Sequence, residues 1–171
     1  MNEPILLYIQ GIYKNDINKY VVNPACHNTE DSNYDTIPQK YEGLVKWPRR
    51  TNVLCGHHGL AHSNVPIFIP EFFSYYDDAN ISINIIKLLF CSFPCASAYI
   101  TNKYFGTERD NKLAGLRYIY KIFTGTNINY IPVAPDKMEI TAFGGSKASY
   151  TPQSYMDHVC RLIPPASYII S

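Results

Sequence analysis

The sequence predicts a small α+β domain in which a β-hairpin is followed by helices. Its 171 residues suit one domain, and 46% hydrophobic residues against 17% charged residues support a packed core. In the first half of the chain, apolar residues alternate with polar ones or are interrupted by prolines, as in short strands. In the second half, apolar residues recur at helical spacing between glycines that end helices.

Extended segments are expected in the first part of the chain. Residues 5–13, rich in Ile, Leu and Tyr, favour a strand, and the polar composition of residues 23–39 favours a surface loop. Two prolines in residues 65–73 (VPIFIPEFF) predict an edge-like extended segment. After a polar turn at residues 75–80, alternating isoleucines predict a half-buried strand over residues 81–90. Together these segments give an out-and-back β excursion.

A first helix is expected over residues 96–105, which have helical composition and end at Gly106. Thr107 and Asp110 resemble a weak capping box for a second helix, which Gly125 would end. One face of this second helix carries apolar side chains at helical spacing. These side chains are Leu113, Leu116, Tyr120 and Phe123.

The last part of the chain predicts two more helices. Residues 128–133 are expected to be extended, and residues 136–143 to form a short helix stopped by the glycines at 144–145. Thr151 and Pro152 combine a good N-cap residue with the residue favoured at the first helical position. They predict a final helix, which ends before two consecutive prolines.

The strongest chemical signal is a set of cysteine and histidine residues in two close pairs. Cys55 and His58 are separated by two residues, and Cys91 and Cys95 by three. Such spacing lets each tight turn aim two side chains at one ion, so the four residues can close a tetrahedron around zinc. Cys95 adjoins the first expected helix, whose positive dipole end favours a thiolate. The sequence therefore predicts one structural Zn²⁺, with no open coordination position for catalysis.

Other assignments of the cysteines and histidines stay open. Cysteines are among the most often buried residues, so a plain core position also fits them. His57 competes with His58 as the ligand, and His62 is a reserve candidate. A second ion could use two further Cys/His pairs, although a spare thiol and an exposed histidine explain them more simply. These residues are Cys26, His27, His158 and Cys160.

Several motifs around the two pairs resemble one viral protein family. The chain reads WPRRT from Trp47, then Cys55, then VPIFIP over residues 65–70, then FCSFPCASAY over residues 90–99. This order is similar to the poxvirus-type late gene transcription factor family, type 2, of large nucleo-cytoplasmic DNA viruses. The likeness covers about residues 47–158 and includes the later strings APD and FGG. The FCSFPCASAY string is also similar to zinc knuckles of the MYM and TRASH type.

The resemblance implies a treble-clef-like zinc knuckle in a virus-encoded factor that supports late gene transcription. Its partners would be viral transcription machinery or other viral proteins, with nucleic acid as an open option and no membrane. Its location would be the host cytoplasm, in the virus factory, with packaging in the virion also open. The family commonly has a cysteine pair in the first position, whereas this chain has Gly56 after Cys55 and His58 as the second ligand. Histidine is an acceptable zinc ligand, so a Cys₃His site is chemically sound.

Two basic patches are candidates for contact with nucleic acid or a partner protein. Lys46, Arg49 and Arg50 flank Trp47 just before the zinc site, and cations beside an aromatic ring can grip phosphate and stack on a base. Trp47 also fits a core anchor. The second patch, which also fits a solvated helix face, consists of Lys112, Arg117 and Lys121.

The composition narrows the class of function. With 15 basic against 14 acidic residues the net charge is +1, which is low for a protein that holds DNA by bulk charge. The chain shows no signal peptide and no membrane-spanning stretch, so a soluble intracellular protein is expected. It shows no nucleophile elbow, phosphate loop or paired carboxylates, so an enzyme is not expected. The alternative function is a virion structural or assembly protein that uses the zinc knuckle for protein binding.

Three regions are expected along the chain. Residues 1–45 form an N-terminal strand and polar loop region, residues 46–162 the zinc-binding domain, and residues 163–171 a tail. Removal of the metal is expected to unfold residues 55–99 and to leave the later helices largely intact, because those helices have an apolar core of their own. The sequence leaves the oligomeric state open.

Overall fold

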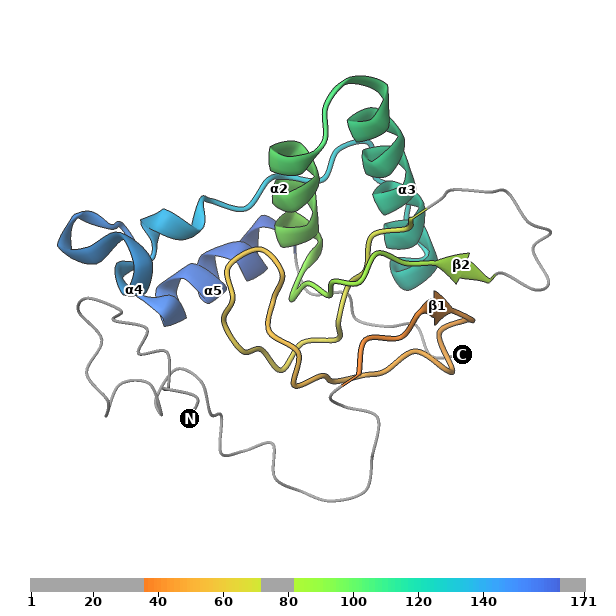
Figure 1. The fold of residues 1–171 in the computed structure, drawn as a ribbon, viewed down its shortest axis with the longest axis horizontal. Helices are drawn as coiled ribbons and strands as arrows, with labels where there is room; N and C mark the ends of the chain where they lie inside the picture. Colours follow the sequence, from red (N-terminus) through yellow and green to blue (C-terminus); the bar gives the residue numbers. More distant parts are fainter. Residues whose placement is uncertain (1–35, 72–81, 164–171) are drawn as a thin grey trace, which may run out of the picture.

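A computed structural model describes residues 36–71 and 82–163, which form a small α+β fold with a two-stranded antiparallel sheet (Figure 1). The expectations for residues 5–13, for most of the 23–39 loop and for the 75–80 turn lie outside the described residues. The regular elements, in chain order, are β1 (Lys40–Tyr41), β2 (Ile83–Asn84), α2 (Phe93–Lys103), α3 (Gly106–Thr124), η2 (Lys137–Glu139), α4 (Thr141–Gly144), η3 (Gly145–Lys147) and α5 (Pro152–Leu162).

The expected β excursion is present, although isolated bridges hold most of it. Residues 65–70 run out and residues 85–90 return antiparallel to them, while β1 pairs antiparallel with β2. Because proline has no N–H group, Pro66 and Pro70 interrupt the ladder of hydrogen bonds. The strand expected over the return segment is therefore confirmed only at β2 and at single bridges. The paired residues are Lys40–Asn84, Tyr41–Ile83, Ile67–Phe90 and Pro70–Ile85.

α2 starts earlier than the expected residue 96, because a local cap precedes it. Ser92 is the N-cap, and its hydroxyl accepts a hydrogen bond from the Cys95 amide at 3.3 Å. Phe93 and Pro94 then form the beginning of the first turn. Cys95 consequently lies inside the first turn of α2, and its side chain is fixed by helix geometry.

The capping box expected at Thr107 and Asp110 is wrong. The N-cap of α3 is Phe105, and no side chain caps this end of the helix. The expected end of α3 is confirmed, because Gly125 adopts the left-handed conformation with φ of 70°. The Gly125 amide donates a hydrogen bond to the Lys121 carbonyl at 2.8 Å, as in a helix-ending turn.

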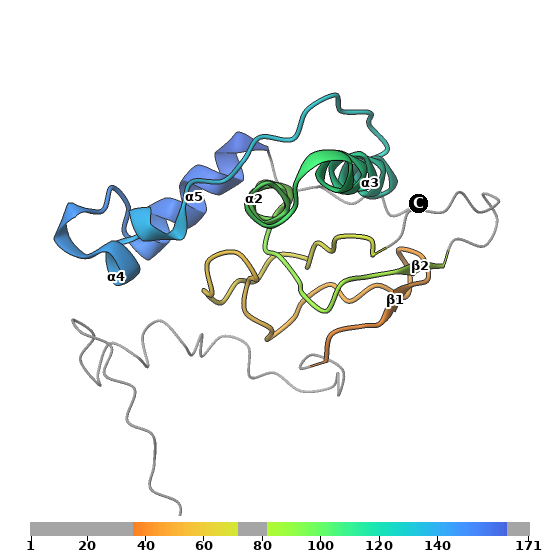
Figure 2. The same cartoon turned by 45° about the horizontal axis from the view of Figure 1, so that its top comes forward.

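The apolar face expected for α3 packs into the core. Leu116 and Phe123 are fully buried, and Leu113 and Tyr120 are partly buried against the same cluster. In both ribbon views α2 lies between α3 and α5, and the strands and loops of the first part of the chain lie beneath these helices (Figures 1 and 2). α2 is therefore the central element of the fold.

Trp47 anchors the loop that precedes the two cysteine and histidine pairs. Its side chain is 5% exposed, and its ring lies 4.7 Å from the Phe68 ring and 5.7 Å from the Tyr41 ring, measured between centroids. Its Nε1 donates a hydrogen bond to the Pro66 carbonyl at 2.8 Å. A buried tryptophan with its N–H satisfied is well suited to hold a loop on a core.

The short helix expected over residues 136–143 forms as two shorter pieces, η2 and α4. A parallel bridge between Ile140 and Tyr150 closes the loop that these pieces form. Gly144 lies so close to the Met138 carbonyl oxygen that a Cβ atom would collide with it. Only glycine therefore fits this position without moving the backbone.

α5 begins and ends as the sequence predicts. The Thr151 hydroxyl accepts a hydrogen bond from the Ser154 amide at 3.2 Å, and Pro152 is the first helical residue. Tyr155 and Val159 form the buried face of the helix. Among the described residues, no helix combines the length and the apolar character that crossing a membrane requires.

Candidate metal centre

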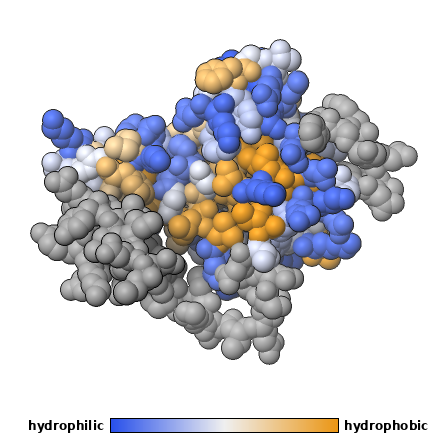
Figure 3. Space-filling model, in the orientation of Figure 1, coloured by the Kyte–Doolittle hydropathy of each residue, from blue (hydrophilic) through white to orange (hydrophobic). Residues whose placement is uncertain are grey.

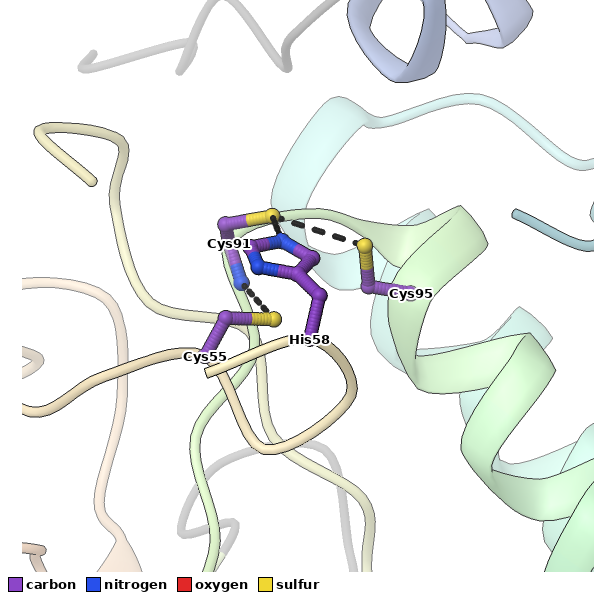
Figure 4. A group of neighbouring side chains, drawn as sticks. All are labelled: Cys55, His58, Cys91 and Cys95. Atoms are coloured by element: carbon purple, nitrogen blue, oxygen red, sulfur yellow. Dashed lines mark hydrogen bonds between the residues drawn. The ribbon is translucent and has the colours of Figure 1, made fainter. Parts of the chain in front are cut away.

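The structure brings the four predicted metal ligands together. The ligand atoms of Cys55, His58, Cys91 and Cys95 all lie within 4.8 Å of one another, and all four residues are buried. Figure 4 shows the imidazole ring of His58 among the three sulfur atoms. Cys55 and His58 lie on one loop. Cys95 lies in the first turn of α2, and Cys91 lies just before the N-cap of this helix.

A tight turn positions the first pair of ligands. The Gly59 amide donates to the Cys55 carbonyl at 2.7 Å, and the Cys55 amide donates to the Leu60 carbonyl at 3.1 Å. Gly59 adopts φ of 72°, which glycine tolerates without strain. The Gly56 amide donates to the Leu89 carbonyl at 2.8 Å, so the turn is fastened to the segment that leads to the second pair.

The second pair of ligands is held by the beginning of α2. The sulfur atoms of Cys91 and Cys95 lie 3.5 Å apart, and the Cys91 amide donates to the Cys55 sulfur at 3.5 Å. The Ser92 hydroxyl caps the helix and also lies 3.7 Å from the Cys91 sulfur. The partial positive charge of the helix N-terminus would help to stabilise a Cys95 thiolate bound to a cation.

The His58 ring turns Nε2 toward the sulfur atoms. Nε2 lies 3.3 Å from the Cys91 sulfur, while Nδ1 accepts a hydrogen bond from the Leu60 amide at 3.1 Å. A neutral imidazole that binds a metal through Nε2 carries its proton on Nδ1. A metal bound at Nε2 would therefore require a proton on Nδ1, and the Leu60 amide could then no longer donate to that atom.

Two of the donor–donor distances are close to those of a tetrahedral zinc site. Zinc bonds of about 2.3 Å to sulfur and about 2.0 Å to nitrogen give edges of about 3.8 Å between sulfurs and about 3.5 Å between sulfur and nitrogen. The corresponding distances are 3.5 Å between Cys91 and Cys95, and 3.3 Å between Cys91 and His58. Three cysteines and one histidine are a common set in structural zinc sites. The cluster can therefore hold one metal ion.

The electrostatics of the cluster favour a bound cation. Burial alone would raise the pKa of Cys55, but hydrogen bonds from Cys91, Cys95 and His58 outweigh it and lower that pKa well below its ordinary value. Hydrogen bonds to Cys55, with burial, hold the pKa values of Cys91 and Cys95 well above the ordinary value. A divalent cation at this place would stabilise all three sulfurs as thiolates.

The structure distinguishes His58 from its two competitors. His57 lies outside the cluster, with its Nε2 2.9 Å from the Pro135 carbonyl. His62 is 8% exposed, and its Nδ1 lies 3.2 Å from the Asn64 carbonyl. Its Nε2 has no hydrogen-bond partner among the described residues, and burial lowers its pKa. His58 is the histidine that the fold places among the cysteines.

The two neighbouring histidines are expected to differ sharply when replaced. His58→Ala should strip most of the zinc, because it removes one of the four converging donors. His57→Ala should leave zinc bound, because its ring contacts the Pro135 carbonyl. Elemental analysis of both purified variants measures the difference. Loss of zinc from His57→Ala, with retention in His58→Ala, would reverse the assignment.

His158 and Cys160, the two candidates for a second metal site that the structure describes, do not belong to a metal-ligand group there. His158 packs against the Tyr150 ring, with centroids 5.2 Å apart, and Cys160 is a half-buried thiol 4.0 Å from the Asn64 side-chain amide. The part of the chain that the structure describes contains a single group of metal-ligand type. The other two candidates, Cys26 and His27, lie outside that part.

In the first basic patch, Arg49 and Arg50 are exposed but Trp47 is buried. Trp47 is buried in the core, so its ring is not available to stack on a base. Lys46 forms an exposed ion pair with Glu42 at 3.1 Å. Arg49 and Arg50 are exposed, and they are the residues of this patch that remain open for contact.

The second basic patch is partly tied into the fold. The Lys112 ammonium donates to the carbonyls of Pro70 and Glu71, at 3.2 and 2.8 Å, and lies 5.2 Å from the centre of the Tyr104 ring. It thereby joins α3 to the 65–71 segment. Lys121 is exposed near the end of α3.

One residue beside the metal ligands could not be identified from its sequence context. Tyr155 of α5 is fully buried, and its ring meets the His58 ring edge-on with centroids 5.4 Å apart. Its hydroxyl donates to the Pro135 carbonyl at 2.6 Å. The helical spacing of Tyr155 and Val159 indicates a buried face, but no local pattern shows that this face meets the metal ligands.

No protein-family model, curated protein or solved structure matches the chain. The motif resemblance and the geometry of the cluster are therefore the two grounds on which a function can be proposed.

Proposed function

We propose that this chain is a zinc-binding factor encoded by a large DNA virus, and that it supports late gene transcription in the host cytoplasm. It would act through contacts with transcription machinery, with nucleic acid, or with both. The observation that carries this proposal is the buried cluster of Cys55, His58, Cys91 and Cys95. These residues lie in and beside the motifs that resemble the viral late gene transcription factor family, type 2. A turn supplying one ligand pair and a helix start supplying another favour a treble-clef-like knuckle around zinc.

The proposed role of the metal is structural, not catalytic. All four donors come from the chain, and all four residues are buried. A tetrahedral ion with four protein ligands has no open position for water or substrate, which is the arrangement of structural zinc sites. We therefore propose a binding protein and not an enzyme.

Arg49 and Arg50 are the proposed contact residues. They are exposed on the loop that Trp47 anchors, shortly before the first metal ligand. Their charges are open for contact, whereas Lys46 is paired with Glu42 and Lys112 is held by two carbonyls. An anchored loop with exposed guanidinium groups suits phosphate or carboxylate recognition, because guanidinium binds both in a bidentate manner.

Replacing both arginines is expected to weaken binding without unfolding the protein. If the partner is nucleic acid, Arg49→Ala with Arg50→Ala should reduce the log–log salt slope by roughly 0.7–0.9 for each phosphate that the protein no longer neutralises. Stability should change by less than about 0.5 kcal/mol per site, because both residues are exposed. An electrophoretic mobility titration at several salt concentrations measures the slope, and a denaturant titration measures stability.

A matched variant removes the same charge elsewhere. Lys121→Ala with Lys147→Ala takes two exposed positive charges from α3 and η3 and should leave the salt slope nearly unchanged. If this control weakens binding more than the arginine variant, the contact surface is on the helices. Zinc loss or early unfolding of the arginine variant would make those arginines structural.

The alternative proposal is a virion structural or assembly protein that uses the zinc knuckle for protein binding. The net charge of +1 and several exposed large apolar side chains favour this alternative. Figure 3 shows a mostly hydrophobic area around the base of α2 and the loops beneath it. Weak nucleic-acid binding without salt dependence would select this alternative. Within residues 36–71 and 82–163, the large apolar residues that are exposed are Val45, Leu54, Phe105, Tyr130, Val133, Met138 and Phe143.

A further inference from the structure

α5 contacts the metal ligand His58 through Tyr155. The ring of Tyr155 meets the His58 ring edge-on at 5.4 Å, and the Tyr155 hydroxyl donates to the Pro135 carbonyl at 2.6 Å. The same carbonyl lies 2.9 Å from Nε2 of His57. Pro135 thus joins the loop of the first ligand pair to the helix. The position of this helix depends on where His57 and His58 lie.

Other polar contacts of the C-terminal unit, defined as residues 134–163, lead to the same place. The Ala134 amide donates to the Pro94 carbonyl at 3.1 Å, in the first turn of α2 beside Cys95. The Asn64 side-chain amide donates to the Cys91 carbonyl at 3.2 Å and lies 4.0 Å from the Cys160 sulfur. These polar contacts therefore lead to the ligands or to residues beside them, and the buried side chains of Val159 and Ile163 add packing in the hydrophobic core.

α3 is anchored mainly on aromatic residues, of which Phe93 lies between Cys91 and Cys95 in the chain and Phe68 does not adjoin a ligand. Phe123 packs within 6.1 Å of the rings of Phe68 and Phe93, and Leu116 and Ile119 are fully buried. α3 and α5 lie on opposite sides of α2 (Figure 2). His58, the histidine among the metal ligands, contacts the ring of Tyr155 on α5 and not these aromatic residues.

We propose that metal binding and docking of the C-terminal unit are coupled, so that metal loss releases α5 while α3 stays packed. The ion fixes the 55–60 turn to the start of α2, and this turn presents His57 and His58 to Pro135 and Tyr155. Because coupling is reciprocal, docking of α5 strengthens metal binding by the same factor. The coupling rests on the metal binding proposed above and adds a conformational switch to it. It departs in two ways from the expectation drawn from the sequence: α5 is released with the metal, and Phe68 and Phe93 of the 55–99 segment stay packed on α3.

Hydrogen exchange on the full chain tests the release. The protein is compared with one zinc bound and after treatment with a chelator. Amides of α5 should lose their protection when zinc is removed, and amides in the middle of α3 should keep theirs. Equal protection of α5 in both states would overturn the coupling, as would simultaneous loss in both helices. A chain that binds no zinc at all would instead refute the metal site itself.

Variants at Tyr155 test the reciprocal effect. Tyr155→Ala should weaken zinc affinity by about tenfold, as measured by competition with a chromophoric chelator. Tyr155→Phe keeps the ring and loses only the hydrogen bond to Pro135, so its affinity should fall less. Tyr120→Ala removes an aromatic ring from α3 that packs on Phe93, whereas the Tyr155 ring packs on His58 itself, so the zinc affinity of Tyr120→Ala should fall clearly less than that of Tyr155→Ala.

Two outcomes at these positions would overturn the coupling. The first is unchanged zinc affinity in Tyr155→Ala. The second is an equal loss of affinity in Tyr120→Ala, which would show a general effect of stability. If Tyr155→Ala fails to fold, Tyr155→Phe decides, because it retains the buried ring: unchanged affinity and unchanged exchange in α5 would count against the proposal.

Discussion

Cys91→Ser is expected to remove most of the zinc from the protein. Cys91 is 2% exposed, and its sulfur lies 3.3 Å from Nε2 of His58 and 3.5 Å from the sulfur of Cys95. A serine hydroxyl does not ionise as a thiol does and does not reach as far. The loss of affinity should exceed the roughly 10–100-fold that changes around metal ligands usually cause. Elemental analysis should find about one zinc per chain before the change and far less after it.

Cys160→Ser is the matched control for this variant. It makes the same chemical change at a half-buried thiol on α5 that is not part of the cluster. Zinc content should therefore stay as in the unmodified chain. A fully folded protein that contains no zinc before any substitution would contradict the metal site, and zinc loss from the control alone would move the site to α5.

Trp47→Ala is expected to be among the most destabilising single substitutions in the chain. It removes a side chain that is only 5% exposed and that packs on Phe68 and Tyr41. Large aromatic residues replaced by alanine in a core cost about 3–5 kcal/mol. The substitution also leaves the Pro66 carbonyl without its hydrogen bond from the indole. Denaturant titration of the zinc-loaded protein measures the change in the free energy of unfolding.

Two companion variants sharpen this measurement. Trp47→Phe keeps an aromatic ring but loses the hydrogen bond to Pro66, so its cost should be smaller. Val45→Ala alters a side chain that is 99% exposed two positions away and should change stability by less than about 0.5 kcal/mol. A change in the free energy of unfolding below about 1 kcal/mol for Trp47→Ala would contradict its role as a core anchor and favour a role in partner contact.

The metal cluster and α5 could be predicted because their signals are local. Pair spacing identifies ligands that a single turn can aim at one ion, and Thr151 with Pro152 satisfies helix-start chemistry within a few residues. The choice between His57 and His58 followed the two-residue gap and the resemblance. The structural reason for this choice is a contact far along the chain: the His57 ring lies against the Pro135 carbonyl and so outside the cluster.

The predictions for the starts of α2 and α3 were wrong, because another local feature of the chain determined where each helix begins. Ser92 is a strong N-cap, so α2 starts earlier than its apolar composition indicates. At α3, Thr107 and Asp110 have the residue types of a cap, but the chain enters the helix at Phe105 in an extended conformation. The contacts of Tyr155 with His58 depend on residues far apart in sequence, and no local pattern carries them.

The position of Trp47 makes the protein its own optical probe. It is the only tryptophan of the chain and lies in the aromatic core with Tyr41 and Phe68. Its fluorescence therefore reports on the packing of this aromatic core, against which Phe123 of α3 also lies. Emission that stays blue-shifted after chelation would mark a partly folded, metal-free form. Fluorescence can thus monitor the aromatic core while hydrogen exchange or proteolysis monitors α5.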